Sequence, residues 1–173
     1  LIILFINLVL AANITWIFNE NTLTIKGTGP MNYYTVGQQP WFVYKNSTKN
    51  VIIENGITTI GSSSFEKFDN LESVQISSTV EIIEEFAFSE CSKLKSITIP
   101  TSVTDLSDSA FEECTSMKTI QLPSTLKTIG KRVFSLCTSL ETITIPSGVQ
   151  TIGNDAFYSC ENLKSVVISN GVK

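Results

Sequence analysis

Residues 91–114 read CSKLKSITIPTSVTDLSDSAFEEC, and the chain after Val51 repeats this pattern of apolar positions at a constant step. The step is 23 residues, and it separates the phenylalanines Phe65, Phe88, Phe111, Phe134 and Phe157. Self-similarity at a period between about 20 and 50 residues is typical of stacked supersecondary units that share one core. The chain is therefore predicted to be a repeat solenoid.

Six further apolar columns keep the same step, and none of them contains a charged residue. They begin at Ile60, Phe68, Leu71, Val74, Ile76 and Val80. A single unit buries too little apolar surface to offset the entropy of ordering its backbone, so stability has to come from contacts between neighbouring units. The columns predict a continuous apolar interior along the array.

Each unit combines extended segments with one short turn. Residues 94–100 alternate polar and β-branched apolar side chains, which predicts a strand that ends at Pro100. Residues 149–153 indicate a second, shorter extended segment, and glycines recur there at Gly61, Gly130 and Gly153. Phe111 and Cys114 are three positions apart, which predicts one helical turn that is too short to be stable alone. We expect a mainly β fold with one short helical turn per 23-residue repeat.

Residues 13–50 lie outside the period and are predicted to form an N-terminal cap. Two apolar segments around Trp16 and Ile25 flank residues 19–22, which predicts a β-hairpin. A solenoid needs such a cap, because its first unit otherwise exposes an apolar face and an unpaired strand edge. The bulk to cover that face can come from Tyr33, Tyr34, Trp41 and Phe42.

The unit from Cys91 to Cys114 resembles the BspA-like, or Treponema-type, leucine-rich repeat. The resemblance extends into the cap, through residues 23–31 and Pro40-Trp41, with Phe68 and Met117 as departures from the expected Cys and Leu. It implies a curved leucine-rich-repeat solenoid of a secreted or cell-surface protein of bacteria or protists. It also implies adhesion to host matrix proteins, host cells or other microbes.

Residues 1–12 are apolar except for Asn7 and end in two alanines, which predicts a signal peptide whose beginning lies upstream. The alternative is a buried first strand. The segment is too short to span a bilayer as a helix, which needs about 20 apolar residues. Asn13 and Asn46 each begin an Asn-x-Ser/Thr triplet and are candidate glycosylation sites, which agrees with export.

Composition argues against several classes of function. The formal net charge is -4 and the 12 basic residues are scattered, so the basic patch of a nucleic-acid binder is missing. The chain contains no histidine, which excludes His-based catalysis and His metal ligands. No phosphate-binding glycine motif is present. We expect no nucleic acid partner, no cofactor and no catalytic residue.

The four cysteines form one column, Cys91, Cys114, Cys137 and Cys160. Four ligands in a line do not suit the tetrahedron of a structural zinc site, so no metal is expected. Phe68 occupies the same column and favours inward-facing thiols that act as small apolar groups. Strained disulfides between neighbouring units remain the alternative.

The residues that alternate with the buried positions of the main strand form a uniform exposed face. This candidate partner-binding face comprises Ser73, Gln75, Ser96, Thr98, Thr119, Gln121, Thr142, Thr144, Ser165 and Val167. A solvated sheet explains these residues equally well, with ion pairs between Glu72 and Lys95 or between Lys118 and Glu141 beside it. The face has no Trp, Tyr or Arg, so we expect weak contacts that gain strength by multivalency.

The sequence therefore indicates a non-enzymatic extracellular or cell-surface protein that binds a protein or glycan through its repeats. The repeats of residues 51–173 are expected to continue beyond Lys173, because no closing cap is visible. The alternative is a rigid spacer or recognition arm of a larger receptor or enzyme with a further C-terminal domain. A membrane anchor is possible only outside this sequence, and nothing indicates an oligomeric state.

Overall fold

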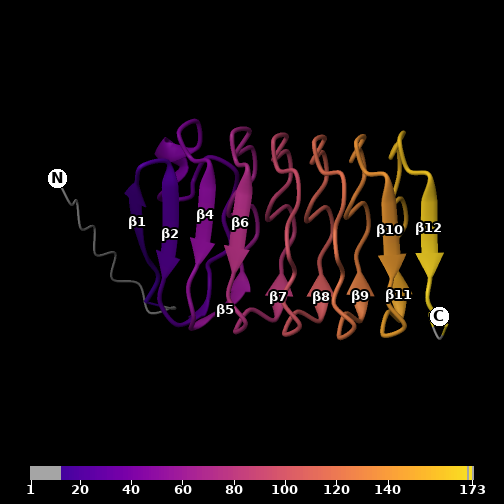
Figure 1. The fold of residues 1–173 in the computed structure, drawn as a ribbon. Helices are drawn as coiled ribbons and strands as arrows, with labels where there is room; N and C mark the ends of the chain where they lie inside the picture. The colour runs from indigo at the N-terminus through magenta and orange to yellow at the C-terminus, as the bar shows by residue number, and fades with distance from the viewer. Residues whose placement is uncertain (1–12, 171, 173) are drawn as a thin grey trace.

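The chain winds into a row of stacked turns, and each turn returns to the side of the one before it (Figure 1). The computed structural model describes residues 13–170 and residue 172, so the predicted signal peptide lies outside the described part. We call each 23-residue turn a rung and number the rungs 1 to 5 by their phenylalanines, from Phe65 to Phe157.

Twelve strands and one short helix make up the described part. The strands are β1 Thr15–Asn19, β2 Thr22–Lys26, β3 Gly29–Pro30, β4 Asn50–Ile53, β5 Ile57–Ile60, β6 Ser73–Ile76, β7 Ile82–Ile83, β8 Asp105–Leu106, β9 Thr128–Ile129, β10 Thr142–Ile145, β11 Thr151–Ile152 and β12 Ser165–Ile168. The helix is the 3₁₀ turn η1, Phe42–Tyr44.

The strands form two sides of the solenoid. One side carries a sheet in the order β1-β2-β4-β6 and a smaller sheet β10-β12, and the other carries a sheet in the order β11-β9-β8-β7-β5-β3. All neighbours are parallel except the hairpin β1-β2. Ser73 lies beside Asn50, and Ser165 lies beside Thr142, so the pairing follows the 23-residue step. The predicted solenoid is confirmed.

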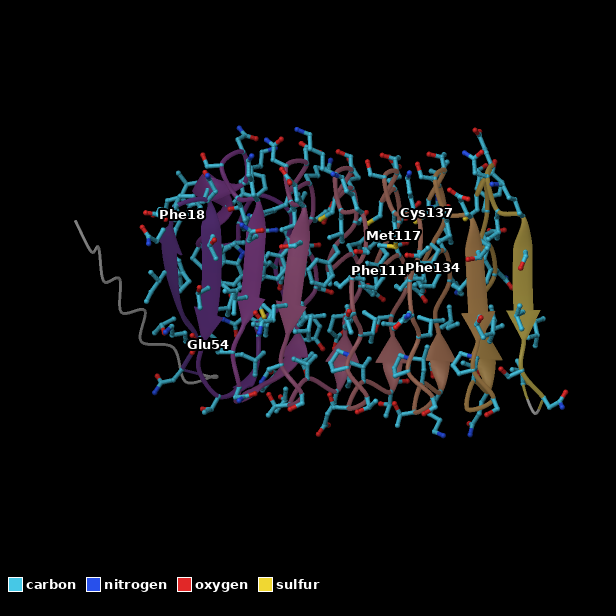
Figure 2. All side chains as sticks on the ribbon, viewed as in Figure 1. Phe18, Glu54, Phe111, Met117, Phe134 and Cys137 are labelled. Atoms are coloured by element: carbon cyan, nitrogen blue, oxygen red, sulfur yellow. The ribbon has the colours of Figure 1, made fainter. Side chains whose placement is uncertain are left out.

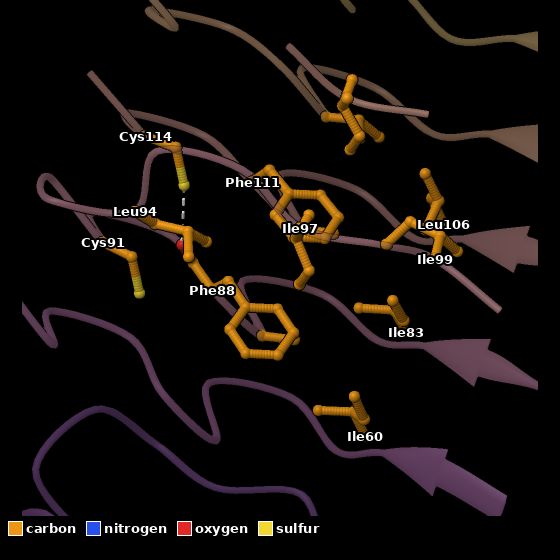
Figure 3. Close-up of a cluster of buried hydrophobic side chains, with 14 of the residues drawn as sticks. Ile60, Ile83, Phe88, Cys91, Leu94, Ile97, Ile99, Leu106, Phe111 and Cys114 are labelled. Atoms are coloured by element: carbon orange, nitrogen blue, oxygen red, sulfur yellow. Dashed lines mark hydrogen bonds between the residues drawn. The ribbon is translucent and has the colours of Figure 1, made fainter. Parts of the chain in front are cut away.

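The core is a stack of phenylalanine rings between these two sides. Neighbouring rings from Phe65 to Phe157 lie nearly parallel, with centroids 5.3, 5.4, 5.9 and 5.7 Å apart. The rings of rungs 1 to 4 are fully buried. Figure 2 places Phe111 and Phe134 in the interior of the array, and Figure 3 shows Phe88 beside Phe111. Because each ring needs a neighbour on both faces, the interior is shared between rungs.

The predicted helical turn takes a different form. In rung 2 the N–H of Ala87 donates to Glu84 O and that of Ser89 donates to Phe86 O. The alternate N–H groups, those of Phe86, Phe88 and Glu90, donate to the next rung. Phe86 and Glu90 have left-handed φ values of 55° and 58°, and the equivalent residues of the other rungs do the same. A left-handed residue at every fourth position ends helical winding, so no α-helix occurs among the described residues.

The glycines of the second extended segment serve close approach rather than turning. Gly61 does not have a positive φ, yet a Cβ atom there would lie 2.1 Å from the main-chain oxygen of Asn32. A Cβ atom on Gly130 would lie 2.7 Å from the main-chain nitrogen of Asp108. Glycine is therefore needed at these two positions because the neighbouring backbone passes too near.

The predicted hairpin is present at the N-terminal end. β1 and β2 pair in antiparallel register, with Trp16 beside Ile25, and the turn residues Glu20 and Asn21 have φ values of 46° and 69°. Both values suit the two-residue turns that match strand twist. β2 then runs parallel to β4, so the hairpin continues the sheet of the rungs.

Trp41 closes the phenylalanine stack. Its ring lies 5.9 Å from that of Phe65, at an interplanar angle of 25°, and it is fully buried. Its indole nitrogen donates to Ser64 O at 2.8 Å. Trp16 and Tyr34 contact Trp41 edge-on. The cap thus covers the apolar end of rung 1 with aromatic side chains.

Candidate binding surface

The ten residues of the predicted partner-binding face are all exposed to solvent. Main-chain register brings Thr142 beside Ser165 and Thr144 beside Val167. Isolated bridges place Thr98 beside Gln121 and Thr119 beside Thr142. The residues therefore form two neighbouring columns across the rungs. We call this surface the outer sheet face.

The middle of the outer sheet face is less regular than predicted. The strand predicted for residues 94–100 recurs by the 23-residue step at residues 117–123, but these two segments carry only the isolated bridges among the described residues. Lys118 N still donates to Lys95 O at 3.1 Å. The face consists of two regular ladders, β2-β4-β6 and β10-β12, joined by a more loosely paired segment.

The charged column beside the face pairs differently from the prediction. Lys49 pairs with Glu72 at 3.6 Å and Lys164 pairs with Glu141 at 3.0 Å, so each glutamate uses the lysine on its other side. Lys164 lowers the pKa of Glu141. The like-charged Lys95 and Lys118 occupy adjacent rungs in the loosely paired segment, where neighbouring like charges destabilise a ladder.

The outer sheet face extends into the cap, which sequence reasoning missed. Thr24 lies beside Ile52, and Ile52 lies beside Gln75. Asn50 continues the other column and accepts a hydrogen bond from the Ser73 hydroxyl at 2.7 Å. The period-2 alternation of residues 22–26, TLTIK, was the available signal, because it matches the alternation of the repeat strands.

A shallow hollow of about 340 Å³ marks the cap end of this face. Ile17, which is 50% exposed, lines it together with threonines of β2. The ion pair between Lys26 and Glu54, at 3.0 Å, forms its border. This end of the face therefore offers an apolar contact that the rungs between β6 and β10 lack.

The chemistry of the outer sheet face is hydrogen bonding by neutral groups. Its hydroxyl and amide side chains both donate and accept, and they recur in register along the array. Such groups suit a partner that repeats along its own length or presents many polar groups. Each single contact is weak, because water competes for every exposed hydrogen bond.

The cysteines lie in the interior as the packing interpretation predicted. All four are free thiols, and only Cys160 is not fully buried. Each Sγ lies 3.1 to 3.2 Å from the main-chain oxygen of the phenylalanine in the preceding rung, as with Cys114 and Phe88 O (Figure 3). Burial raises the pKa of Cys91, Cys114 and Cys137, so each keeps its proton and donates it.

Two pairs of adjacent glutamates, Glu84-Glu85 and Glu112-Glu113, occur in rungs 2 and 3, and Glu84 and Glu112 have different partners. Glu112 is largely buried and pairs with Arg132, with Oε1 and Nη2 2.6 Å apart. Glu84 meets Tyr33 of the cap instead. In the part of the chain that the structure describes, no group of three or more Cys, Asp or Glu residues is placed to hold a metal ion.

Both candidate glycosylation residues, Asn13 and Asn46, are exposed. Asn46 follows η1, and its main-chain oxygen accepts a hydrogen bond from Asn70 at 2.9 Å. Thr48 of the same triplet is buried, and its hydroxyl donates to Tyr44 O. The side chain of Asn46 is therefore open to solvent while the rest of its triplet is held in place.

Comparison with known proteins agrees with this architecture. Residues 35–164 match the model of the BspA type leucine rich repeat region, with six copies of the repeat. No curated protein matches the chain. Among the described residues, no helix has the length and apolar character that crossing a membrane requires.

Solved structures with the same fold come from several bacteria. A leucine-rich repeat protein from Eubacterium ventriosum is 30% identical, with a TM-score of 0.81, and the match covers 91% of this chain and 42% of that protein. The leucine rich repeat protein of T. pallidum is 27% identical, with a TM-score of 0.69, over 88% of this chain and 67% of that one.

A leucine rich cell surface protein from Faecalibacterium prausnitzii is 26% identical, with a TM-score of 0.60, over 94% of this chain and 55% of that one. The chain thus spans roughly half the length of the solved structures that it matches, between 42% and 67% for these three.

Proposed function

Because the chain belongs to the BspA-type leucine-rich repeat family, we propose that it is a non-enzymatic protein of the cell surface or the extracellular space. In this proposal the outer sheet face binds a protein or glycan partner and so mediates adhesion to host matrix, host cells or other microbes. The similar Faecalibacterium protein is a cell surface protein, which supports this location. The predicted signal peptide and the exposed Asn13 and Asn46 also support it.

The observation that carries the proposal is the register of exposed polar side chains from Ser73 to Ser165. Parallel pairing repeats the same neutral donors and acceptors on successive rungs. Strands in a sheet lie about 4.8 Å apart, so the spacing of these groups is regular within the ladders β2-β4-β6 and β10-β12. A partner with a repeating polar surface can use several rungs at once.

The strength of binding has to come from the number of contacts. The described part of the face has no Trp, Tyr or Arg, the residues that dominate specific interfaces. Linked weak contacts raise the overall affinity by about 100-fold to 10,000-fold when geometry lets them engage together. We therefore expect a monomeric array to bind weakly and a surface that carries many arrays to bind firmly.

The test is binding of the chain, displayed in many copies on beads, to arrays of matrix proteins, glycans and host cells. The variant Thr98→Lys/Thr144→Lys places two charges on the outer sheet face and should remove the binding. Gln150→Lys/Thr151→Lys is the matched control, because both residues are exposed on the opposite side of the solenoid. Equal loss in both variants, or binding to no surface, would contradict the proposal.

A further inference from the structure

A second surface lies on the side of the solenoid away from the outer sheet face, where the cap meets the first rungs. An open pocket of about 320 Å³ is lined there by Pro30, Met31, Asn32, Tyr33, Thr59 and Glu84. Pro30 belongs to β3, Thr59 belongs to β5, and Glu84 directly follows β7, so the pocket opens beside the second sheet. We propose that it binds a lysine or arginine side chain of a partner protein.

Tyr33 supplies an aromatic surface for such a cation. It is 75% exposed, the most exposed aromatic residue of the described part. The main chain on either side is fixed, because Met31 N donates to Thr59 O at 3.0 Å and Tyr34 N donates to Ser62 O at 3.1 Å. A cation over an aromatic face is attracted by the ring quadrupole. The rigid backbone lowers the entropy lost when a partner binds.

Glu84 supplies the negative charge. The equivalent residues of the other rungs are Gly61, Ser107, Gly130 and Gly153, so Glu84 is the one charged member of its column. Its Oε1 accepts a hydrogen bond from the Tyr33 hydroxyl at 3.4 Å. The ring of Tyr33 and the carboxylate of Glu84, which both attract cations, therefore line the same pocket although they come from different parts of the chain.

The carboxylate of Glu84 has no cationic partner among the described residues. Burial raises the pKa of Glu84, and the charge of Glu85 adds to this increase. A partly buried carboxylate of this kind is stabilised when a counter-charge approaches it. No lysine or arginine lines the pocket, so a counter-charge for Glu84 would come from another molecule.

The choice of a basic side chain follows from this combination. A free metal ion would need more oxygen ligands than the single carboxylate offers. An apolar ligand would leave the charge of Glu84 desolvated. A lysine or arginine places its cation on Glu84 and the ring of Tyr33, and its alkyl stem against Pro30 and Met31.

The test is an NMR titration of the whole chain with N-acetyl-lysinamide and N-acetyl-argininamide, with N-acetyl-norleucinamide as the neutral analogue. We expect saturable shifts of the amide signals of Asn32, Tyr33 and Glu84 with the two cations. The neutral analogue should bind about twofold to fivefold more weakly, since one exposed cation–π contact contributes about 0.5–1 kcal/mol. Shifts that do not saturate, or equal binding of norleucinamide, would overturn the proposal.

Two variants and two matched controls locate the site. Glu84→Gln and Tyr33→Ala should each weaken binding of the cationic probes severalfold without loss of signal dispersion. Glu81→Gln and Tyr158→Ala remove an exposed carboxylate and an exposed tyrosine outside the pocket, and should bind normally. Equal weakening by the controls would refute the assignment. The pocket shares no residue with the outer sheet face, so failure here leaves the adhesion proposal intact.

Discussion

The cap and the interior rungs both have to pair the main-chain hydrogen-bonding groups of the next rung and cover its apolar side chains, and they do so by different means. In the interior, Phe88 N donates to Ala110 O and Phe134 N donates to Ala156 O. Main-chain N–H groups of one rung thus pair with main-chain oxygens of the next rung. At the cap, Phe42 N donates to Gln39 O within the cap itself, and the indole of Trp41 donates to Ser64 O of rung 1 instead. Gln39 similarly donates from its side chain to Ser63 O.

Apolar coverage shows the same contrast. An interior phenylalanine is covered by an identical ring on each side, with interplanar angles of 6° and 7° around Phe111. Rung 1 is covered by Trp41, which is itself held by Trp16 and Tyr34. The interior is therefore covered by one residue type that recurs in register in every rung. The first rung is covered by several different aromatic residues that occur only in the cap.

The most damaging way to break the cap is Trp41→Ala. This change removes the cover of Phe65 and leaves Ser64 O unpaired, so we expect a loss of about 3–5 kcal/mol in the free energy of unfolding. Hydrogen exchange should show lost protection in residues 57–68 and retained protection in rungs 3 and 4. Uniform loss along the array would mean that the cap and the rungs unfold as one unit.

Phe111→Ala breaks the interior in the same manner. We expect a loss of about 3 kcal/mol, because a buried ring is removed and its neighbours collapse only in part. Here the protection of rungs 2 and 4 should fall together, since both contact the missing ring, while the cap hairpin keeps its slow exchange. Chemical denaturation followed by hydrogen exchange of the same variant measures both effects.

Arg132→Ala tests an ion pair between two interior rungs that does not recur along the array. The change leaves the largely buried Glu112 without its partner, and we expect a loss of about 1–3 kcal/mol in denaturation experiments. Rungs 2 and 4 carry Ser89 and Ser135 at the position of Glu112. Glu112→Ser added to Arg132→Ala should therefore recover most of the loss, and an additive double variant would show that the pair contributes little.

The smallest expected effect concerns the left-handed turn residues of the rungs. Glu113 has a φ of 59°, which asparagine adopts more readily than most residues. Glu113→Asn should raise the free energy of unfolding by about 0.5–1 kcal/mol. The control is Glu81→Asn, at an exposed residue without a positive φ, which should not stabilise the chain. Thermal unfolding measures both.

The interior could be predicted from the sequence because each column repeats its own residue type. Phe65 and its equivalents fix the register, and each further rung repeats the same residue types at the same positions, which strengthens the prediction that these positions are buried. The left-handed backbone at Phe86 and Glu90 was not predictable, since neither residue type favours it and the hydrogen bonds to the next rung impose it. The hairpin was predictable because its alternation is local.

The binding surfaces were predictable to different degrees. The outer sheet face follows from alternation within each strand, although the pairing of Glu72 with Lys49 rather than Lys95 depends on neighbouring geometry. The pocket joins Tyr33 and Glu84 across 51 residues, one from the aperiodic cap and one from a repeat. No local pattern connects them, so only the folded chain brings them together.

The hydrogen bonds in the turns all run in the same direction, and this allows the number of 23-residue repeats encoded by the gene to change. Phe65, Phe88, Phe111 and Phe134 all donate their N–H to the following rung. Duplication or excision of 23 codons thus joins surfaces that already match, whichever interior unit is copied. Unequal recombination can lengthen or shorten the array without redesign, while the aromatic terminus has to be inherited as a single block.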